Sequence, residues 1–410
     1  MTNWFKNRVP AGNERLLRDT QGLAIAILVA LFIASPALAG DREQAQRIHD
    51  RIAGVPPTTQ VLDDMEATIV SGGRTQQAYE DAAYMAMDNK NFYGVTLKNL
   101  AVPWTNRDQD LFAPLNDYVA TFIGVVRDEN VPFNEILSAD VLYVGGAGLG
   151  LTPYSPSSNA HYEDLETSGL DLGQQSVLTV ASQTGLNSIP TEGVAGLLTT
   201  RAAAQAFFIA GTNRAMFRFT MLNHLCHDME EVKDITGTPD RIRQDVSRSP
   251  GGDSRVFMNG CIGCHAGMDP LAQAFAYHDY DEAAGRMIYT PGTVRPKYFN
   301  NNETFKFGYI TPNDNWDNYW REGPNRWIGW DFGPTSPGGS GTGAASMGRE
   351  LANSEAFARC QVKKVFKAVC LRDPADGTDV SQLDAMTLSF RNGYRIKQVV
   401  AEAAVYCKGD

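Results

Sequence analysis

The feature that most constrains this chain is a pair of cysteines followed at once by a histidine, Cys261-Ile-Gly-Cys264-His265. On one helical turn this spacing puts both sulfur atoms along one edge, and the adjacent imidazole points to the same side. Two thiols can form thioethers with the two vinyl groups of a haem while the imidazole binds the iron. The motif therefore predicts one covalent haem c, held by Cys261, Cys264 and His265.

Other uses of closely spaced cysteines and histidines are less favoured. A thioredoxin-like pair would need a surrounding β-α-β pattern, which is missing. A zinc site would need a second ligand pair, and Cys360 and Cys370 do not have that spacing. His224 and His227 have a spacing that could bind a metal, but no third ligand is evident, so we expect a surface or supporting role for them.

The first 39 residues have the pattern of an export signal. Four basic residues come first, namely Lys6, Arg8, Arg15 and Arg18. An apolar run over residues 23–34 follows, and Ala37 and Ala39 supply small residues before a cleavage site at Gly40. An uncleaved anchor is the alternative, but the run is short and Pro36 breaks it. We therefore expect a signal peptide over residues 1–39, a periplasmic protein, and no stable membrane span after cleavage.

The composition indicates which classes of binding partner to expect. Of the 410 residues, 43% are hydrophobic and 20% charged, which is ordinary for a soluble globular protein. The net charge is −11 and no cluster of Lys and Arg appears in the body of the chain, so nucleic acid is not an expected partner. The glycine-rich residues 144–151 lack the spacing of a phosphate-binding loop and predict a flexible loop instead.

Apolar periodicity predicts a mainly α fold. Helices are expected over residues 41–51, 58–70, 75–87, 108–127, 134–139, 199–229 with a break near Gly211, 354–371 and 381–404. Residues 291–343 are aromatic- and glycine-rich with little periodicity, and such long irregular stretches are usually functional. We expect an N-terminal helical region over 40–195 and a cytochrome c-like haem-binding domain with long irregular loops over 196–410.

Four cysteines lie outside the motif: Cys226, Cys360, Cys370 and Cys407. Cys360 and Cys370 fall in one predicted helix, where their Cα atoms would be about 15 Å apart, too far for a disulfide with each other. If they are oxidised, each must pair with Cys226 or Cys407. Small buried thiols are the alternative, and the sequence does not decide between the two.

The sixth iron ligand is predicted to be Met347. It ends the glycine- and serine-rich loop 337–347 and precedes the last long helix, where small soluble cytochromes c place their distal methionine. His278 and Met287 are possible ligands, but they lie close in sequence to the motif. An open or histidine-ligated iron is the alternative. Methionine raises the potential, histidine lowers it, and an open site admits small molecules.

Two other polar residues, Asp269 and His161, have local sequence contexts that predict their structure. Asp269, followed by Pro270, is expected to cap a new turn or helix after the motif. His161 lies in a polar stretch that predicts a loop, and no catalytic partner for it is evident.

A family resemblance extends the motif. The run from Cys261 through Met268-Asp-Pro-Leu271 resembles the CxxCH-xx-MDPL motif of planctomycete-type cytochrome c proteins with associated domains of unknown function. Three further stretches, residues 131–140, 196–214 and 350–360, resemble their ELLTADY, GLLTHP…T…R and C-terminal LA.S..FARC segments. Together they span roughly residues 115–370 in the family's order. Gly285-Arg-Met287 departs from the Gly-Arg-Trp-like ending that members often have. The resemblance implies haem c and export, and adds little on mechanism.

These observations predict an exported monohaem electron carrier or electron-transfer subunit, with a redox partner protein. No paired carboxylates or nucleophile–base pair stands out, so an independent enzyme is less favoured. A peroxidase- or oxidase-like haem enzyme with an open distal site is the first alternative. The second is a haem-bearing structural subunit of a larger envelope complex, because one haem does not need a chain this long.

Overall fold

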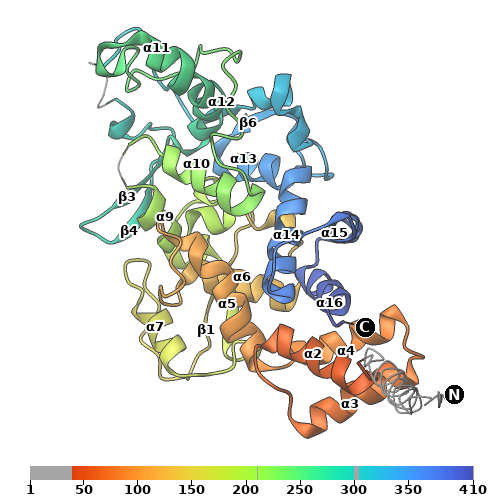
Figure 1. The fold of residues 1–410 in the computed structure, drawn as a ribbon. Coiled ribbons are helices and arrows are strands. Elements are labelled where there is room, and N and C mark those ends of the chain that lie inside the picture. The colour runs from red at the N-terminus through yellow and green to blue at the C-terminus, as the bar shows by residue number, and fades with distance from the viewer. Residues whose placement is uncertain (1–38, 210, 300–303, 410) are drawn as a thin grey trace, which may run out of the picture.

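The computed structural model describes residues 39–209, 211–299 and 304–409 (Figure 1). The predicted signal peptide lies outside these residues apart from Ala39. Helix accounts for 54% of the structure and strand for 7%, which confirms the mainly α prediction. Within the described residues, no helix is both long and apolar enough to cross a membrane.

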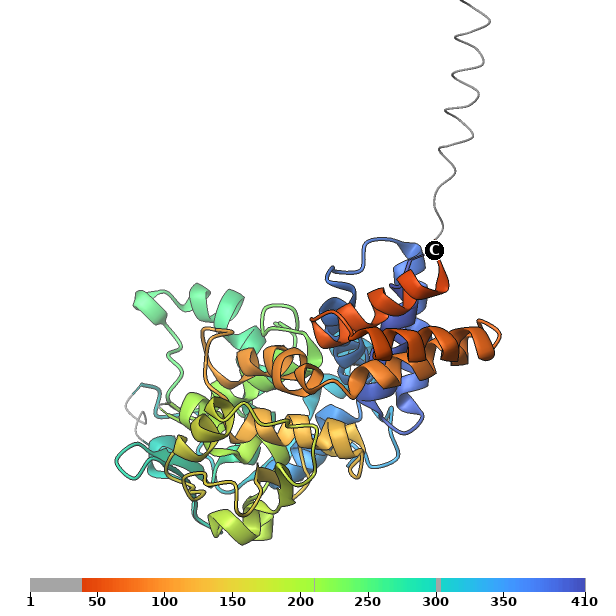
Figure 2. The same cartoon turned by 90° about the horizontal axis from the view of Figure 1, so that it is seen from below.

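Three helices form the N-terminal part, α2 (Asp41–Ala53), α3 (Thr59–Ser71) and α4 (Gln76–Met87). The side chains of Thr58 and Thr75 accept hydrogen bonds from the amides of Val61 and Ala78, which caps α3 and α4. The three helices pack on one another, and α2 and α4 pack on the last helix, α16 (Ile396–Tyr406). The two ends of the described chain therefore lie side by side, as both views show (Figures 1 and 2).

The middle of the chain surrounds one long buried helix. Its elements are η1 (Phe92–Leu97), α5 (Lys98–Ala101), η2 (Val102–Thr105), α6 (Asp117–Asp128), η3 (Phe133–Glu135), β1 (Leu142–Gly145), α7 (Ala160–Thr167), β2 (Leu178–Ala181) and α8 (Gln183–Asn187). Strands β1 and β2 pair antiparallel. Helix α6 is buried along nearly its whole length and packs on β1.

The helix predicted over 108–127 begins only at Asp117. Pro114 keeps the preceding residue out of helix, and the Asn116 side chain caps α6 by accepting from the Val119 amide. The helix predicted over 134–139 is only the short turn η3, followed by further turns.

The rest of the chain is built from many short elements and four longer helices. They are η4 (Thr191–Gly193), η5 (Gly196–Thr199), α9 (Arg201–Phe207), α10 (Arg214–Thr220), η6 (Met221–Leu225), η7 (Pro250–Gly252), α11 (Ser254–Val256), η8 (Phe257–Cys261), α12 (Ile262–Ala272), η9 (Gln273–Phe275), β3 (His278–Asp281), β4 (Arg286–Tyr289), η10 (Pro296–Tyr298), β5 (Asn315–Asp317), η11 (Tyr319–Arg321), η12 (Gly323–Ile328), β6 (Ser340–Thr342), α13 (Gly343–Ala352), α14 (Glu355–Cys370) and α15 (Gly377–Arg391). Strands β3 and β4 form one antiparallel hairpin, and β5 pairs with β6.

One hydrophobic core joins the two predicted regions. Its members run from Ala45 on α2 to Val405 on α16. Phe133, from the N-terminal side of the predicted boundary, contacts the rings of Phe357 and Phe390 from the other side, each at 6.2 Å between ring centroids. The boundary at residue 195 therefore does not divide the molecule into two separate cores.

Helix α14 is the centre of the C-terminal part, and two disulfides attach other segments to it. Cys226 pairs with Cys360, and Cys370 pairs with Cys407. The two cysteines of α14 thus bond to partners elsewhere, as the helical spacing required. The prediction of a single helix over 381–404 is wrong. The chain leaves helical geometry near Gly393, whose φ is +105°, and this divides the segment into α15 and α16.

We expect loss of each disulfide to lower the free energy of unfolding, and the loss to grow with the logarithm of the length of the loop it closes. The bridges span 134 and 37 residues, so chain entropy predicts losses of about 5 and about 4 kcal/mol. The paired variants C226A/C360A and C370A/C407A, unfolded in denaturant beside the wild type, measure this. A larger loss from the shorter loop would contradict the entropic account.

Candidate haem-binding site

Helix α12 presents the predicted motif on its least covered face. Cys261, at the junction of η8 and α12, is partly exposed, as are Cys264 and His265. Their neighbours Ile262 and Ala266 are buried, with 6% and 3% of their surface exposed. Residues three and four apart share one side of a helix, so the two sulfurs and the imidazole face the same way. The structure thus brings these three predicted residues together.

The opposite side of α12 is held closely by its surroundings. A side chain at Gly263 would collide with Lys233, and one at Gly267 would collide with the indole of Trp320. Trp320 is 2% exposed, so it has little room to give way. Helix α12 also packs on α10 and β5. These contacts fix the orientation in which the motif faces outward.

Both cysteines of the motif keep their thiols. All six cysteines of the chain lie in its described part, and the other four are paired in disulfides. The Cys264 sulfur lies 3.5 Å from the carbonyl oxygen of Met229. Burial raises the pKa of the Cys264 thiol, whereas redox-active CxxC motifs lower the pKa of their attacking cysteine. The site therefore offers two thiols for covalent attachment.

The His265 ring is oriented by Asp269, one helical turn later. Its Nδ1 lies 3.1 Å from Asp269 Oδ1. A carboxylate ion only accepts hydrogen bonds, so Nδ1 carries the proton and the lone pair is on Nε2. A histidine that binds a metal is usually oriented in this way. The His265 side chain is 20% exposed, which leaves this nitrogen accessible to a ligand at the surface of α12.

Asp269 is fully buried and is held by two arginines. Arg214 donates to both of its oxygens, at 2.7 and 3.0 Å, and Arg243 donates to its backbone carbonyl at 3.1 Å. Burial opposes ionisation, but the charges of Arg214 and Arg243 outweigh it, so the pKa of Asp269 lies well below its usual range. Arg214 also pairs with Asp245. The site therefore contains an ionised carboxylate directly behind the histidine.

This network corrects the expectation that Asp269 caps a new helix. Helix α12 continues to Ala272 with Pro270 inside it. Proline removes one backbone hydrogen bond and normally interrupts a helix, but here the buried ion pairs hold the turn in place. Sequence reasoning also missed Arg214, Arg243 and Asp245 as site residues. Arg214 is 55 positions from Asp269, and no local pattern connects them.

Apolar surface adjoins the motif. Met258, three residues before Cys261, is 55% exposed. Ile235 is equally exposed, but it lies against Gly263 on the opposite side of α12. The backbone from Phe257 to Cys261 is a π-helical turn, a rare geometry that is frequent at functional sites. A porphyrin attached here would find the apolar Met258 side chain on the same side of the helix as the motif.

Met347 is placed differently from the sequence-based expectation. It lies inside α13 rather than at the end of a loop, and it is 0% exposed in the main core. Helices α12 and α13 share two neighbours, because both pack on η9 and on β5. No contact between Met347 and the motif tests the sixth ligand, so ligation of the iron by Met347 stays a prediction.

The other histidines have local partners. His224 is buried, and its Nε2 lies 2.8 Å from the Tyr118 hydroxyl. His227 pairs with Glu231 at 2.6 Å and contacts the Trp327 ring. In the described ranges, no group of three or more His, Cys, Asp and Glu side chains is placed to hold a metal ion.

The loop prediction for His161 is wrong, because His161 lies on α7. Its Nε2 accepts from the Gly145 amide at 2.8 Å, and the ring is buried. His278 is also buried and bonds to the Gly193 carbonyl through Nε2, at 2.9 Å. Neither imidazole therefore has its Nε2 free for a ligand.

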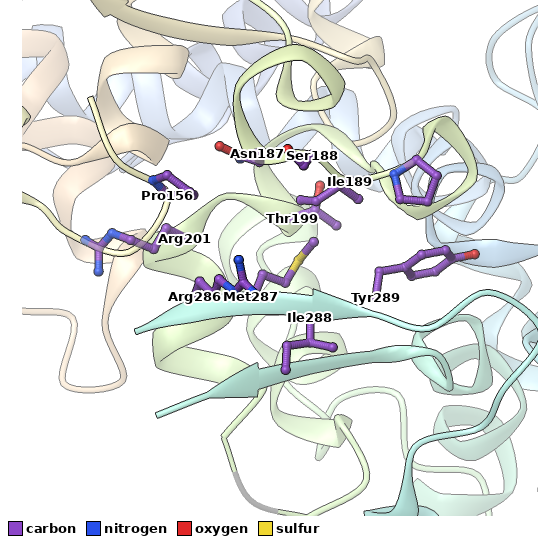
Figure 3. Close-up of a pocket in the computed structure, with 11 residues that line it drawn as sticks. Pro156, Asn187, Ser188, Ile189, Thr199, Arg201, Arg286, Met287, Ile288 and Tyr289 are labelled. Atoms are coloured by element: carbon purple, nitrogen blue, oxygen red, sulfur yellow. The ribbon is translucent and has the colours of Figure 1, made fainter. Parts of the chain in front are cut away.

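A separate cavity of about 330 Å³ lies between the segment 187–190 and strand β4 (Figure 3). Met287, which the sequence offered as a possible iron ligand, lines it beside Arg286 and Tyr289. Arg201 lies at its edge, with its guanidinium bonded to Gln205 and Asn159. None of the motif residues lines this cavity, so it is not part of the candidate site.

Comparisons with known proteins return no match among family models, curated proteins or solved structures.

We expect the fold to require glycine at position 267, because the Trp320 indole lies against the helix backbone there. Gly267→Ala should lower the free energy of unfolding by about 1–3 kcal/mol, because its methyl group would be forced against the buried indole. Gly260→Ala is the matched control, since a Cβ there meets no atom within 4 Å, and it should leave stability unchanged or raise it slightly. Denaturant unfolding compares the two, and equal effects would show that Trp320 does not constrain the helix.

Proposed function

We propose that this chain is an exported monohaem c-type cytochrome that acts in electron transfer. The haem would be attached to Cys261 and Cys264, with His265 as the proximal ligand. One observation carries the proposal: the two free thiols and an imidazole with its Nε2 lone pair available share the least covered face of α12. When bound, the haem would supply one-electron redox chemistry.

The residues around the motif have structural tasks in this proposal. Gly263 and Gly267 let α12 approach Lys233 and Trp320, which keeps the motif facing outward. Asp269 holds the imidazole in one tautomer and one orientation. The exposed Met258 side chain would be covered by the macrocycle, which excludes water from it.

The proposal includes export to the periplasm after removal of residues 1–39. The disulfides Cys226–Cys360 and Cys370–Cys407 support an oxidising compartment, where structural disulfides form and persist. The resemblance to planctomycete-type cytochrome c proteins is consistent with this. The proposal also includes a redox partner protein, which could belong to a larger envelope complex. It does not include nucleic acid as a partner.

A haem enzyme with an open distal side is the second candidate. The buried carboxylate behind His265 favours it, because an anionic partner on the proximal imidazole strengthens electron donation to a bound iron. The placement of Met347 in the main core is consistent with a distal position that another molecule could fill.

Covalent haem is tested by intact-mass measurement of the chain produced in a periplasm with the c-type haem attachment machinery. We expect a mass increase of one haem, which C261S/C264S should abolish because both thioethers are lost. The variant C226S/C360S is the control, since it removes two cysteines that are paired elsewhere. Wild-type protein without covalent haem would overturn the proposal.

The sixth ligand is tested with Met347→Ala. If Met347 binds the iron, the ferric protein should show the weak long-wavelength band of methionine-ligated haem, and the variant should lose it. Met268→Ala is the control, because Met268 lies on the same helix as His265 and cannot reach the opposite face of the ring. A high-spin wild-type spectrum with rapid cyanide binding would instead establish the open site of the second candidate.

A further inference from the structure

The inference concerns the contact between His265 and Asp269. Asp269 Oδ1 accepts from His265 Nδ1 at 3.1 Å and from Arg214 Nε at 2.7 Å, so one oxygen receives both hydrogen bonds. The other oxygen accepts from Arg214 Nη2 at 3.0 Å. The Asp269 side chain is 0% exposed, so water does not compete for these positions. The imidazole is thus bonded to a fixed anion.

The charges around Asp269 balance. Asp269 and Asp245 contribute two negative charges, and Arg214 and Arg243 contribute two positive ones. Arg243 is anchored independently, since its guanidinium donates to Thr311 and Thr212 and packs on the ring of Tyr298. Such a set tolerates burial because each charge has an opposite partner within the same cluster. The carboxylate therefore stays ionised next to the histidine.

We propose that Asp269 is a positioning residue that sets the electron affinity of an iron bound by His265, and that it favours the ferric state. A hydrogen bond to an ion is roughly twice as strong as one between neutral groups, so the ring becomes a stronger electron donor than it would be on a backbone carbonyl. Stronger donation stabilises the higher oxidation state and lowers the reduction potential. This inference rests on the proposed function, because it requires haem at His265.

The test is a potentiometric titration of the haem-loaded full-length protein and of Asp269→Asn. The amide can still accept from Nδ1 through its oxygen but has no charge. We expect the equilibrium constant for reduction to rise about tenfold, which for one electron is about 59 mV toward a higher potential. Asp245→Asn is the matched control, since it removes a charge from the same cluster without touching the imidazole. Its shift should be much smaller.

A second variant keeps the test decisive if the single change prevents folding. D269N/R214Q removes one negative and one positive charge together, and it should raise the potential in the same direction. An unchanged potential in a folded variant with its covalent haem would overturn the inference and leave the proposed function intact. Equal shifts from D269N and D245N would also overturn it, because they would show general electrostatics rather than the bond to His265. Wild-type protein without covalent haem would overturn the proposed function itself.

Discussion

The ion pairs of Asp269 are the contact on which the candidate site depends. Burying a carboxylate is costly unless opposite charges are supplied, and here Arg214 from α10 and Arg243 from the preceding loop supply them. The same contacts attach α12 to two separate segments. Because Asp269 lies one turn after His265, the group that anchors the helix also orients the imidazole. The same ion pairs therefore determine both where α12 lies and how the His265 imidazole is oriented.

The site lies where the main hydrophobic core meets a smaller apolar cluster. The main core runs from α2 to α16, and both disulfides attach segments to α14. Cys264 packs against the main core, and Cys261 packs against a small separate cluster that includes Ile242 and Phe257. The motif therefore lies between the two clusters, and its own face of α12 stays partly exposed.

Features encoded locally could be predicted from the sequence, and those that depend on distant contacts could not. The spacing of Cys261, Cys264 and His265 fixes their shared face, and the periodicity of α2 and α14 gave their bounds closely. The Arg214–Asp269 pair joins residues 55 positions apart, so no window of sequence contains it. Met347 was assigned to a loop because glycines precede it, but burial of the helix against η3 and η9 outweighs their low helix propensity.

The carboxylate behind His265 also bears on the choice between the two candidate functions. A strongly donating imidazole lowers the potential of an electron carrier and, equally, stabilises the higher oxidation states that a haem enzyme uses. The proximal side is therefore compatible with both. What separates them is the group on the opposite side of the iron, where a methionine would raise the potential against the effect of Asp269 and an open position would admit a substrate. If haem is attached here, the balance between Asp269 and that distal group, rather than the CxxCH motif, would determine what the site does.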